Sequence, residues 1–100
     1  MKFLNCPYYE IIILLRHSFI KDFQKLSFDV KKEVRRICLD IFPRIKGLIE
    51  FQDYSIKEMQ GFKSYYRIRV GHYRIGFKKN GEEIIFMRVL ARKDIYKFFP

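Results

Sequence analysis

Residues 65–77 read YYRIRVGHYRIGF, two short runs of alternating apolar and polar side chains that are joined by Gly71-His72. Alternation with a period of two is typical of a half-buried strand, and a two-residue link that begins with glycine is typical of a tight hairpin. Because successive side chains of a strand point to opposite faces of a sheet, the apolar members should share one face. The stretch therefore predicts a β-hairpin with three guanidiniums on one sheet face, those of Arg67, Arg69 and Arg74.

A second turn signal extends this hairpin toward the C-terminus. Asn80-Gly81 predicts a type I′ turn, because both central positions of that turn require a positive φ. The apolar residues that follow predict a strand over Glu83–Ala91, and Arg92–Phe99 is expected to close as a short turn or helix. Residues 65–91 thus predict a three-strand antiparallel meander.

The N-terminal half predicts one strand and two helices. Tyr8–Arg16 contains the unbroken apolar run IIILL, which favours a strand covered on both faces. Ser18 and Ser27 are the expected N-caps of two successive helices, and Pro43 is expected to push the preceding residue, Phe42, out of the helical region and to end or kink the second helix. Helical spacing predicts these buried positions: Phe19, Ile20, Phe23, Leu26, Val30, Val34, Ile37, Cys38 and Ile41.

The segment between the helices and the meander is the least informative part of the chain. Arg44–Phe51 suggests another helical turn or two, and Asp53–Gly61 is predicted to be a connecting loop. Taken together, residues 1–100 predict a single α+β domain. Its N-terminal strand and helical hairpin are followed by the antiparallel meander, which packs on the helices.

Composition narrows the class of partner. The chain has 100 residues, 49% of them hydrophobic, which favours a globular fold over a disordered basic tail. Its formal charge is +10, and residues 61–100 carry ten basic and three acidic side chains. This excess predicts attraction to a polyanion such as nucleic acid or a ribosome. An acidic protein or an anionic membrane surface would also satisfy the charge.

Several classes are not expected. Cys6 and Cys38 have no metal-ligand spacing with each other or with His17 and His72, so neither a metal site nor a disulfide framework is predicted. No apolar stretch approaches the roughly 20 residues that span a bilayer. The sequence is therefore interpreted as cytoplasmic, with no membrane association and no small-molecule cofactor.

The basic face is the candidate functional surface. Arg67, Arg69, Arg74 and Arg92 lie on predicted strands or strand ends. The planar fork of arginine matches phosphate geometry and keeps its charge. The alternative is a solvated face that serves solubility alone.

Aromatic side chains and one histidine accompany the arginines. Tyr65 and Tyr96 interleave with the basic residues, a combination that single-stranded RNA recognition uses through base stacking. Packing of an aromatic C-terminus on the core is the alternative for Tyr96. His72 in the turn is a possible general base or acid near neutral pH, or simply a solvated loop residue.

Two segments resemble the RelE/ParE toxin superfamily. Residues 66–75, YRIRVGHYRI, and residues 88–96, RVLARKDIY, are similar to the family pattern of a YRIRVGDYRI stretch followed by RVxxRKDIY. Gln60-Gly61 ahead of the hairpin and the upstream strand with its helical hairpin fit the same family. The resemblance covers roughly residues 8–99.

The resemblance implies a small α+β toxin of a type II toxin–antitoxin pair. RelE-like members enter the ribosomal A site and promote attack of a ribose 2′-OH of the mRNA on the adjacent phosphate. ParE-like members share the fold and poison DNA gyrase. The basic strand positions and the arginine-to-tyrosine ending favour the RelE-like activity here. The implied partners are an acidic, RelB-like antitoxin and the ribosome, including its rRNA, with bound mRNA.

The resemblance also implies roles for individual residues. Arg74, Arg92 and Tyr96 fall on catalytic positions, and RNA binding falls to Arg67, Arg69, Lys93 and Tyr65. Some relatives carry lysines at the first two basic strand positions, but a guanidinium cannot act as a base because its pKa exceeds about 12. His72, Tyr96, Lys93 or the rRNA is then the expected general base. A gyrase inhibitor and a non-catalytic RNA-binding module remain as alternatives.

Overall fold

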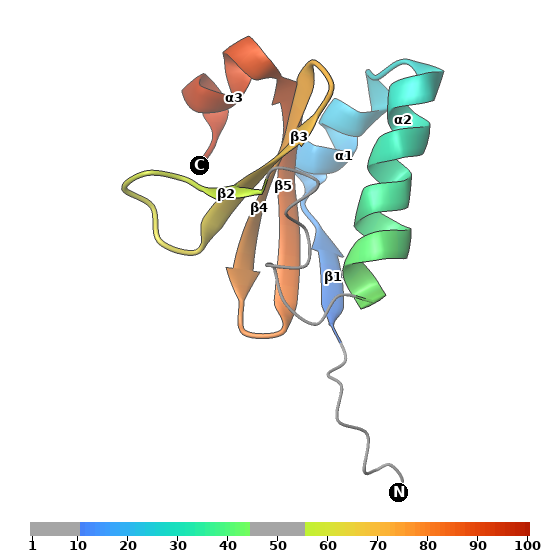
Figure 1. The fold of residues 1–100 in the computed structure, drawn as a ribbon. Coiled ribbons are helices and arrows are strands. Elements are labelled where there is room, and N and C mark those ends of the chain that lie inside the picture. The colour runs from blue at the N-terminus through green and yellow to red at the C-terminus, as the bar shows by residue number, and fades with distance from the viewer. Residues whose placement is uncertain (1–10, 45–55) are drawn as a thin grey trace, which may run out of the picture.

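A mixed sheet runs through the middle of the molecule in the computed structural model, which describes residues 11–44 and 56–100 (Figure 1). Its strands are β1 (Ile12–Leu15), β2 (Lys57–Glu58), β3 (Tyr65–Val70), β4 (Tyr73–Asn80) and β5 (Glu83–Ala91). They form a five-stranded sheet in the order β1-β5-β4-β3-β2. β1 is parallel to β5, and the other neighbours are antiparallel. The predicted α+β class and the β3–β4–β5 meander are confirmed.

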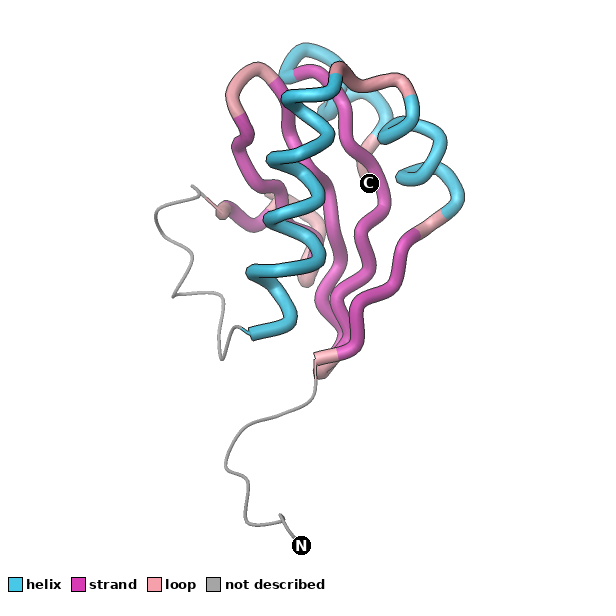
Figure 2. The backbone as a smooth tube through the Cα atoms, turned by 90° about the vertical axis from the view of Figure 1, so that its right-hand side faces the viewer, coloured by secondary structure: helices cyan, strands magenta, loops and turns pink. Residues whose placement is uncertain are grey.

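Helices cover both faces of the sheet, unequally. α1 (His17–Gln24) and α2 (Phe28–Arg35) form the predicted helical hairpin, and α2 continues through a π-helical segment, Arg36–Ile41, and a 3-10 turn, Phe42–Arg44. Figure 2 shows this long helical unit running across one face of the sheet. α3 (Arg92–Phe98) packs on the opposite face, against β4 and β5. No helix within the described ranges is long and apolar enough to cross a membrane.

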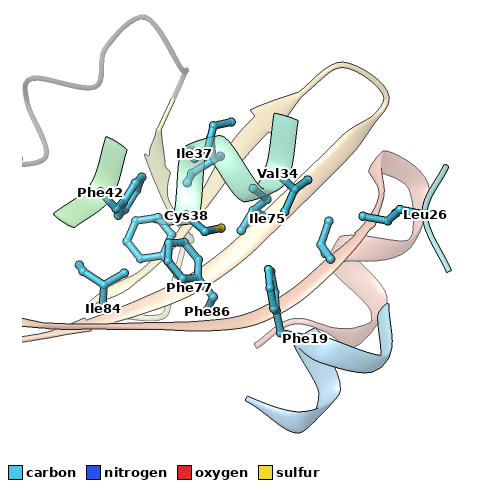
Figure 3. Packing of buried hydrophobic residues seen from close by; sticks show 12 residues of the cluster. Phe19, Leu26, Val34, Ile37, Cys38, Phe42, Ile75, Phe77, Ile84 and Phe86 are labelled. Atoms are coloured by element: carbon cyan, nitrogen blue, oxygen red, sulfur yellow. The ribbon is translucent and has the colours of Figure 1, made fainter. Parts of the chain in front are cut away.

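The main core lies between the helical hairpin and the sheet (Figure 3). Phe42 meets Phe77 and Phe86 with ring centroids 5.2 Å away in each case, and all three side chains are fully buried. Fully burying a side chain of this size contributes about 1.5–3 kcal/mol. The predicted inward positions at Phe19, Leu26, Val34, Ile37 and Cys38 are confirmed as buried. The other predicted positions are less buried: Phe23, Val30 and Ile41 are partly buried against this core, and Ile20 is 39% exposed.

Pro43 does not end the helix where the local rule predicts. Phe42 has φ −57° and ψ −39°, which is helical, so the expectation that Pro43 forces it into an extended conformation is wrong. The reason is tertiary: Phe42 can reach Phe77 and Phe86 only if the helical path continues to it. Most of the predicted extension over Arg44–Phe51 lies outside the described residues.

Ser18 is not the N-cap of α1. The helix begins at His17 with Arg16 at the N-cap, and the Ser18 hydroxyl donates instead to the carbonyl of Met87 on β5, at 2.7 Å. β1 ends at Leu15, so the edge of β5 beyond it needs other hydrogen-bond partners, and Ser18 supplies one. Ser27 occupies the predicted N-cap position of α2, but its side chain makes no capping hydrogen bond.

Two strand predictions need correction. β1 is an edge strand and not one covered on both faces, since Ile12, Leu14 and Leu15 are 49%, 41% and 40% exposed. Residues 8–10 of the predicted strand lie outside the described residues. The predicted loop over Asp53–Gly61 contains β2, a strand too short to produce a readable alternation.

Both hairpin turns are two-residue loops led by glycine. Gly71 has φ +58° and begins the predicted Gly71-His72 turn. In the second hairpin Asn80 still pairs with Glu83, so the turn is Gly81-Glu82 and not Asn80-Gly81. Gly81 has φ +63°, whereas Glu82 does not have a positive φ. A positive φ at only the first central residue is the type II′ pattern, so the predicted type I′ turn is wrong.

Candidate functional site

The predicted arginines share the sheet face that α2 does not cover, hereafter the arginine face. In the β3–β4 register Arg69 is directly opposite Arg74, and Arg67 is opposite Gly76. Directly opposed residues of an antiparallel pair point to the same side, so the prediction of one common face is confirmed. Placing like charges opposite each other destabilises a sheet. The arrangement therefore has to be explained by something other than sheet stability.

Arg74 is the centre of this face. Only 7% of its surface is exposed, and its Nη1 donates to the carbonyls of Gly71 and Tyr73, each at 2.9 Å. The hairpin backbone thus fixes the guanidinium in place. Within the described ranges no carboxylate forms an ion pair with Arg74. Its Nε and Nη2 make no hydrogen bond among the described residues and still reach solvent.

The surroundings lower the pKa of Arg74. Burial is the largest cause, and repulsion from Arg69, Arg67 and Arg92 adds to it. Arginine nevertheless stays protonated at neutral pH, because its ordinary pKa is above about 12. The fold therefore holds a buried cation among other cations, which is a strongly anion-attracting site.

α3 brings the C-terminal candidates to the same place. The backbone N–H of Arg92 donates to the carbonyl of His72 at 2.9 Å, which ties the start of α3 to the β3–β4 turn. An open hollow beside this contact is lined by His72, Ala91, Arg92, Lys93 and Tyr96. Arg92, Lys93, His72 and Tyr96 are all exposed. The predicted cation, aromatic and histidine candidates thus meet at one end of the arginine face.

Tyr96 links the hollow to the sheet. The Arg67 guanidinium lies over the Tyr96 ring, 5.6 Å from its centroid, while 59% of Tyr96 remains exposed. A cation–π contact of this kind orients both partners. A ring held in this way beside the arginines is available to stack on a base.

Phe99 and Gly76 position the helix. Phe99 is 3% exposed, and a Cβ placed on Gly76 would lie 2.7 Å from its ring. Ile95, Phe99 and Met59 form a second apolar cluster on this side of the sheet, against which Tyr65 and Leu90 pack. Only glycine at position 76 allows the C-terminal segment to approach so closely. The position of α3 against the sheet depends on that contact, and so does the position of Tyr96.

Tyr65 is the predicted site residue that lies apart. It occupies the start of β3, at the end of the strand remote from the Gly71-His72 turn, and its ring is 5.8 Å from Phe99. The ammonium of Lys78 lies over the Tyr65 ring, 5.2 Å from its centroid. Tyr65 thus combines a packing role with a place on the arginine face.

Two residues near the site were not predicted. Lys57 lies opposite Arg67 in the β2–β3 register and so joins the arginine face. Asp22 on α1 is 7% exposed and binds Arg88 of β5. No sequence signal identified either one, because β2 is two residues long and Asp22 and Arg88 are 66 positions apart. Among the residues that the structure describes, no cluster of His, Cys, Asp and Glu could hold a metal ion.

Comparison with known proteins agrees with this geometry. Residues 13–96 match the family model described as the ParE toxin of the type II toxin-antitoxin system, parDE. Toxin RelE3 of Methanocaldococcus jannaschii is 40% identical over 88 residues, which cover 88% of this chain and 98% of that protein.

Solved structures show the same likeness. The RelB-RelE antitoxin-toxin complex from Methanococcus jannaschii contains a chain with a TM-score of 0.69 and 37% identity, over 87% of this chain and 99% of that chain. The RelBE2 toxin-antitoxin complex from Mycobacterium tuberculosis gives a TM-score of 0.66 at 16% identity, over 84% of this chain and all of that chain, so it supports the fold alone.

Proposed function

Because the chain belongs to the RelE/ParE superfamily and is a RelE-like toxin of a type II toxin–antitoxin system, we propose that it is a ribosome-dependent endoribonuclease. In this proposal it cuts mRNA in the ribosomal A site and so inhibits translation. One observation carries it: the buried Arg74 has no carboxylate partner among the described residues and stands beside Arg69, Arg67 and Arg92. Such a cluster suits a phosphate that becomes more negative during the reaction.

The proposed step is attack of a ribose 2′-oxygen on the adjacent phosphorus. The O2′–P bond forms and the P–O5′ bond breaks, a base takes the proton of the 2′-OH, and the departing 5′-oxygen gains a proton. Arg74 and Arg92 stabilise the charge that develops on the phosphoryl oxygens and the leaving group. Arg67, Arg69 and Lys93 hold the RNA backbone, and Tyr96 orients a base by stacking, as does Tyr65 farther along the face.

The general base is proposed to come from the hollow. His72, Tyr96 and Lys93 all line it, and each can carry a transferable proton. The guanidiniums are excluded from this role by their high pKa. A rRNA group in the A site is the remaining source.

The proposed protein partner is an acidic, RelB-like antitoxin. The chain carries a formal charge of +10, and relatives have been crystallised as RelB–RelE complexes. The molecule also exposes apolar side chains on β1 and α1, including Leu14, Leu15 and Ile20, beside an apolar groove of about 230 Å³. An acidic partner with apolar contacts would neutralise the charge and cover these side chains.

Primer extension on ribosome-bound mRNA with an empty A site tests the catalytic proposal. A new cut within the A-site codon is expected with the wild-type protein and not on free RNA. Arg92→Ala should lose the cut, whereas Arg35→Ala, which changes an exposed arginine on α2, should keep it. Intact mRNA with well-folded wild-type protein would contradict the proposal.

The match to the ParE family model favours one second candidate, inhibition of DNA gyrase. Under that function toxicity should survive Arg74→Ala and Arg92→Ala, and the purified protein should inhibit supercoiling. An RNA-binding module without catalysis would instead lose RNA affinity in these variants, while even the wild-type protein makes no cut.

A further inference from the structure

We propose a second single-stranded RNA subsite, beside the catalytic cluster and at the β2 edge of the sheet. It consists of Lys57, Phe62, Tyr65 and Lys78 and is called the edge subsite below. It binds nucleotides that flank the cut phosphate and takes no part in the chemical step. The inference rests on the proposed function, because it extends the same RNA path.

The sheet register places the edge subsite in line with the arginines. Lys57 is directly opposite Arg67, and Lys78 is directly opposite Tyr65, so all four side chains emerge on the arginine face. Tyr65, Arg67 and Arg69 alternate along β3. A strand rises about 3.3 Å per residue, so these rows lie about 7 Å apart. That separation is comparable with the spacing of successive phosphates in an extended single strand.

Phe62 supplies an aromatic surface that the core does not use. It is 51% exposed, and its ring meets Tyr65 edge-on at a centroid distance of 6.4 Å. Lys78 lies over the Tyr65 ring at 5.2 Å, and Lys57 is exposed on β2. The exposed ring of Phe62 and the half-buried ring of Tyr65 lie near these lysines. Single-strand binding uses this combination, with cations on the backbone and rings under the bases.

The loop that carries Phe62 has a defined shape. Ser64 has φ +74°, which is unusual for a residue other than glycine, and its N–H donates to Glu58 Oε2 at 3.0 Å. Its carbonyl accepts from the Lys79 N–H at 2.9 Å. Phe62 and Met59 are also joined through their backbones at 3.1 Å. A strained residue held on both sides keeps Phe62 in position without burying it.

Continuity with the catalytic cluster favours RNA as the occupant. Tyr96 contacts Arg67, and Lys57 lies opposite Arg67 in the strand register. Tyr65 is the next residue of β3 on this face, and its ring contacts Phe62. Cations and rings therefore continue from the hollow to the sheet edge on one face. An acidic protein segment is the competing occupant, and the experiment below distinguishes the two.

Length-dependent binding tests the edge subsite. Fluorescent RNA oligonucleotides with 2′-O-methyl groups throughout cannot be cut, so binding is measured without chemistry. Wild-type protein should bind a nonamer at least tenfold more tightly than a trimer. The double variant Lys57→Gln/Phe62→Ala should weaken the nonamer about tenfold and leave the trimer within twofold, because a stacked base alone accounts for roughly fivefold or more.

Salt dependence separates the two side chains. Removing one phosphate-contacting lysine should reduce the slope of log affinity against log salt by about 0.7 on a single strand. Lys57→Gln should show this decrease, and Phe62→Ala should weaken nonamer binding without it. Lys57→Gln changes an exposed residue and so keeps the measurement independent of folding.

The chain offers a matched control on α2. Phe28 is 73% exposed and Lys32 lies over its ring at 5.7 Å, but α2 covers the opposite face of the sheet. Lys32→Gln/Phe28→Ala should bind both oligonucleotides like the wild-type protein. Arg74→Ala should weaken both lengths.

Four outcomes would overturn the edge subsite. The first is a wild-type protein with no preference for the nonamer. The second is an edge double variant that binds the nonamer normally, and the third is a double variant that loses equal affinity for trimer and nonamer. The fourth is a double variant with normal RNA binding and weakened binding to an acidic partner protein. None of these outcomes depends on cleavage, so a failure of RNA binding at the edge subsite can be distinguished from a failure of cleavage on the ribosome.

Discussion

Arg88 and Arg74 lie on neighbouring strands of one sheet, in opposite electrostatic surroundings. Arg88 on β5 makes a bidentate pair with Asp22, with Nε–Oδ2 at 2.7 Å and Nη2–Oδ1 at 3.1 Å, and this pair raises the pKa of Arg88. Among the described residues Arg74 on β4 donates to backbone carbonyls and to no carboxylate, and burial with neighbouring arginines lowers its pKa. The same side chain is neutralised within the fold in one place and left as a free positive charge in the other.

The difference between the two arginines separates a residue that supports stability, Arg88, from a candidate functional residue, Arg74. Asp22 also accepts the backbone N–H of Val89 at 3.1 Å, so it closes the edge of β5 that β1 leaves open, and this supports the fold. The fold could have paired Arg74 in the same way, yet among the described residues it surrounds Arg74 with like charges. The fold tolerates that repulsion, and under the proposed function an anionic phosphate supplied from outside the chain would balance it.

The largest effect is expected at the unpaired arginine. Arg74→Ala should reduce A-site cleavage at least 100-fold, because removing one donor from a developing oxyanion costs about 2.7–4 kcal/mol. The free energy of unfolding should change by less than about 1 kcal/mol, since relief of repulsion offsets two lost carbonyl bonds. Single-turnover cleavage and urea unfolding measure the two quantities. A large stability loss would make Arg74 a structural residue and remove the contrast with Arg88.

The opposite pattern is expected at Asp22. Asp22→Ala should lower the free energy of unfolding by about 3 kcal/mol, because it leaves the Arg88 charge and a buried backbone N–H without their partner. Urea unfolding at neutral pH measures this loss. Asp22→Asn, which keeps an acceptor, should lose less. A change below about 1 kcal/mol would mean that the pair is no more valuable than an exposed one.

Gly76 tests the contact between the sheet and the C-terminal segment that follows α3. Gly76→Ala should cost about 1–3 kcal/mol, because the added methyl meets the Phe99 ring at 2.7 Å and the C-terminal segment must move. Since α3 carries Tyr96, cleavage should also fall. Thermal unfolding measures the stability, and a cleavage assay measures the activity. Gly81→Ala is the control that separates overpacking from backbone strain, because Gly81 lies in an open turn with nothing near the new methyl.

The arginine face could be predicted because strand alternation is local. Arg67, Arg69 and Arg74 fall on one side by parity alone, and a glycine-led turn sets their register. The residue pattern alone places Arg92 on the basic face and makes Tyr96 a candidate for base stacking, whereas their catalytic roles come from the resemblance to a family. The sequence predicts α3 only as a turn or short helix, and no local signal predicts the close contact of Phe99 with Gly76.

What could not be predicted depends on distant partners. Asp22 looks like any surface carboxylate until α1 is placed against β5. Lys57 lies in a strand of two residues, which carries no periodicity. The apolar run of β1 suggested a covered central strand, yet the strand lies at the edge, because an apolar run shows affinity for a partner and does not say which partner is present.

The smallest predicted effect is a change of stability with pH caused by Cys38, a buried core residue that can be compared with Arg74. Cys38 and Arg74 are both buried ionisable groups, and burial shifts each toward its neutral form, raising the pKa of the Cys38 thiol and lowering that of Arg74. The thiol stays protonated in the folded state, whereas the unfolded chain releases that proton above about pH 8.5. Above this pH the unfolded state therefore binds fewer protons, and stability should fall by up to about 1.4 kcal/mol per pH unit.

Urea unfolding between pH 7.5 and 9.5 under reducing conditions measures this slope. Cys38→Ala should abolish its thiol contribution, whatever its overall cost in packing. Arg74→Ala should keep the full slope, because the guanidinium is charged in both states below about pH 12. An unchanged slope in Cys38→Ala would show that another group titrates. If the dependence of the unfolding free energy on pH disappeared in Arg74→Ala, Arg74 would be the group whose protonation changes on unfolding. Its charge at neutral pH could then not be treated as independent of stability.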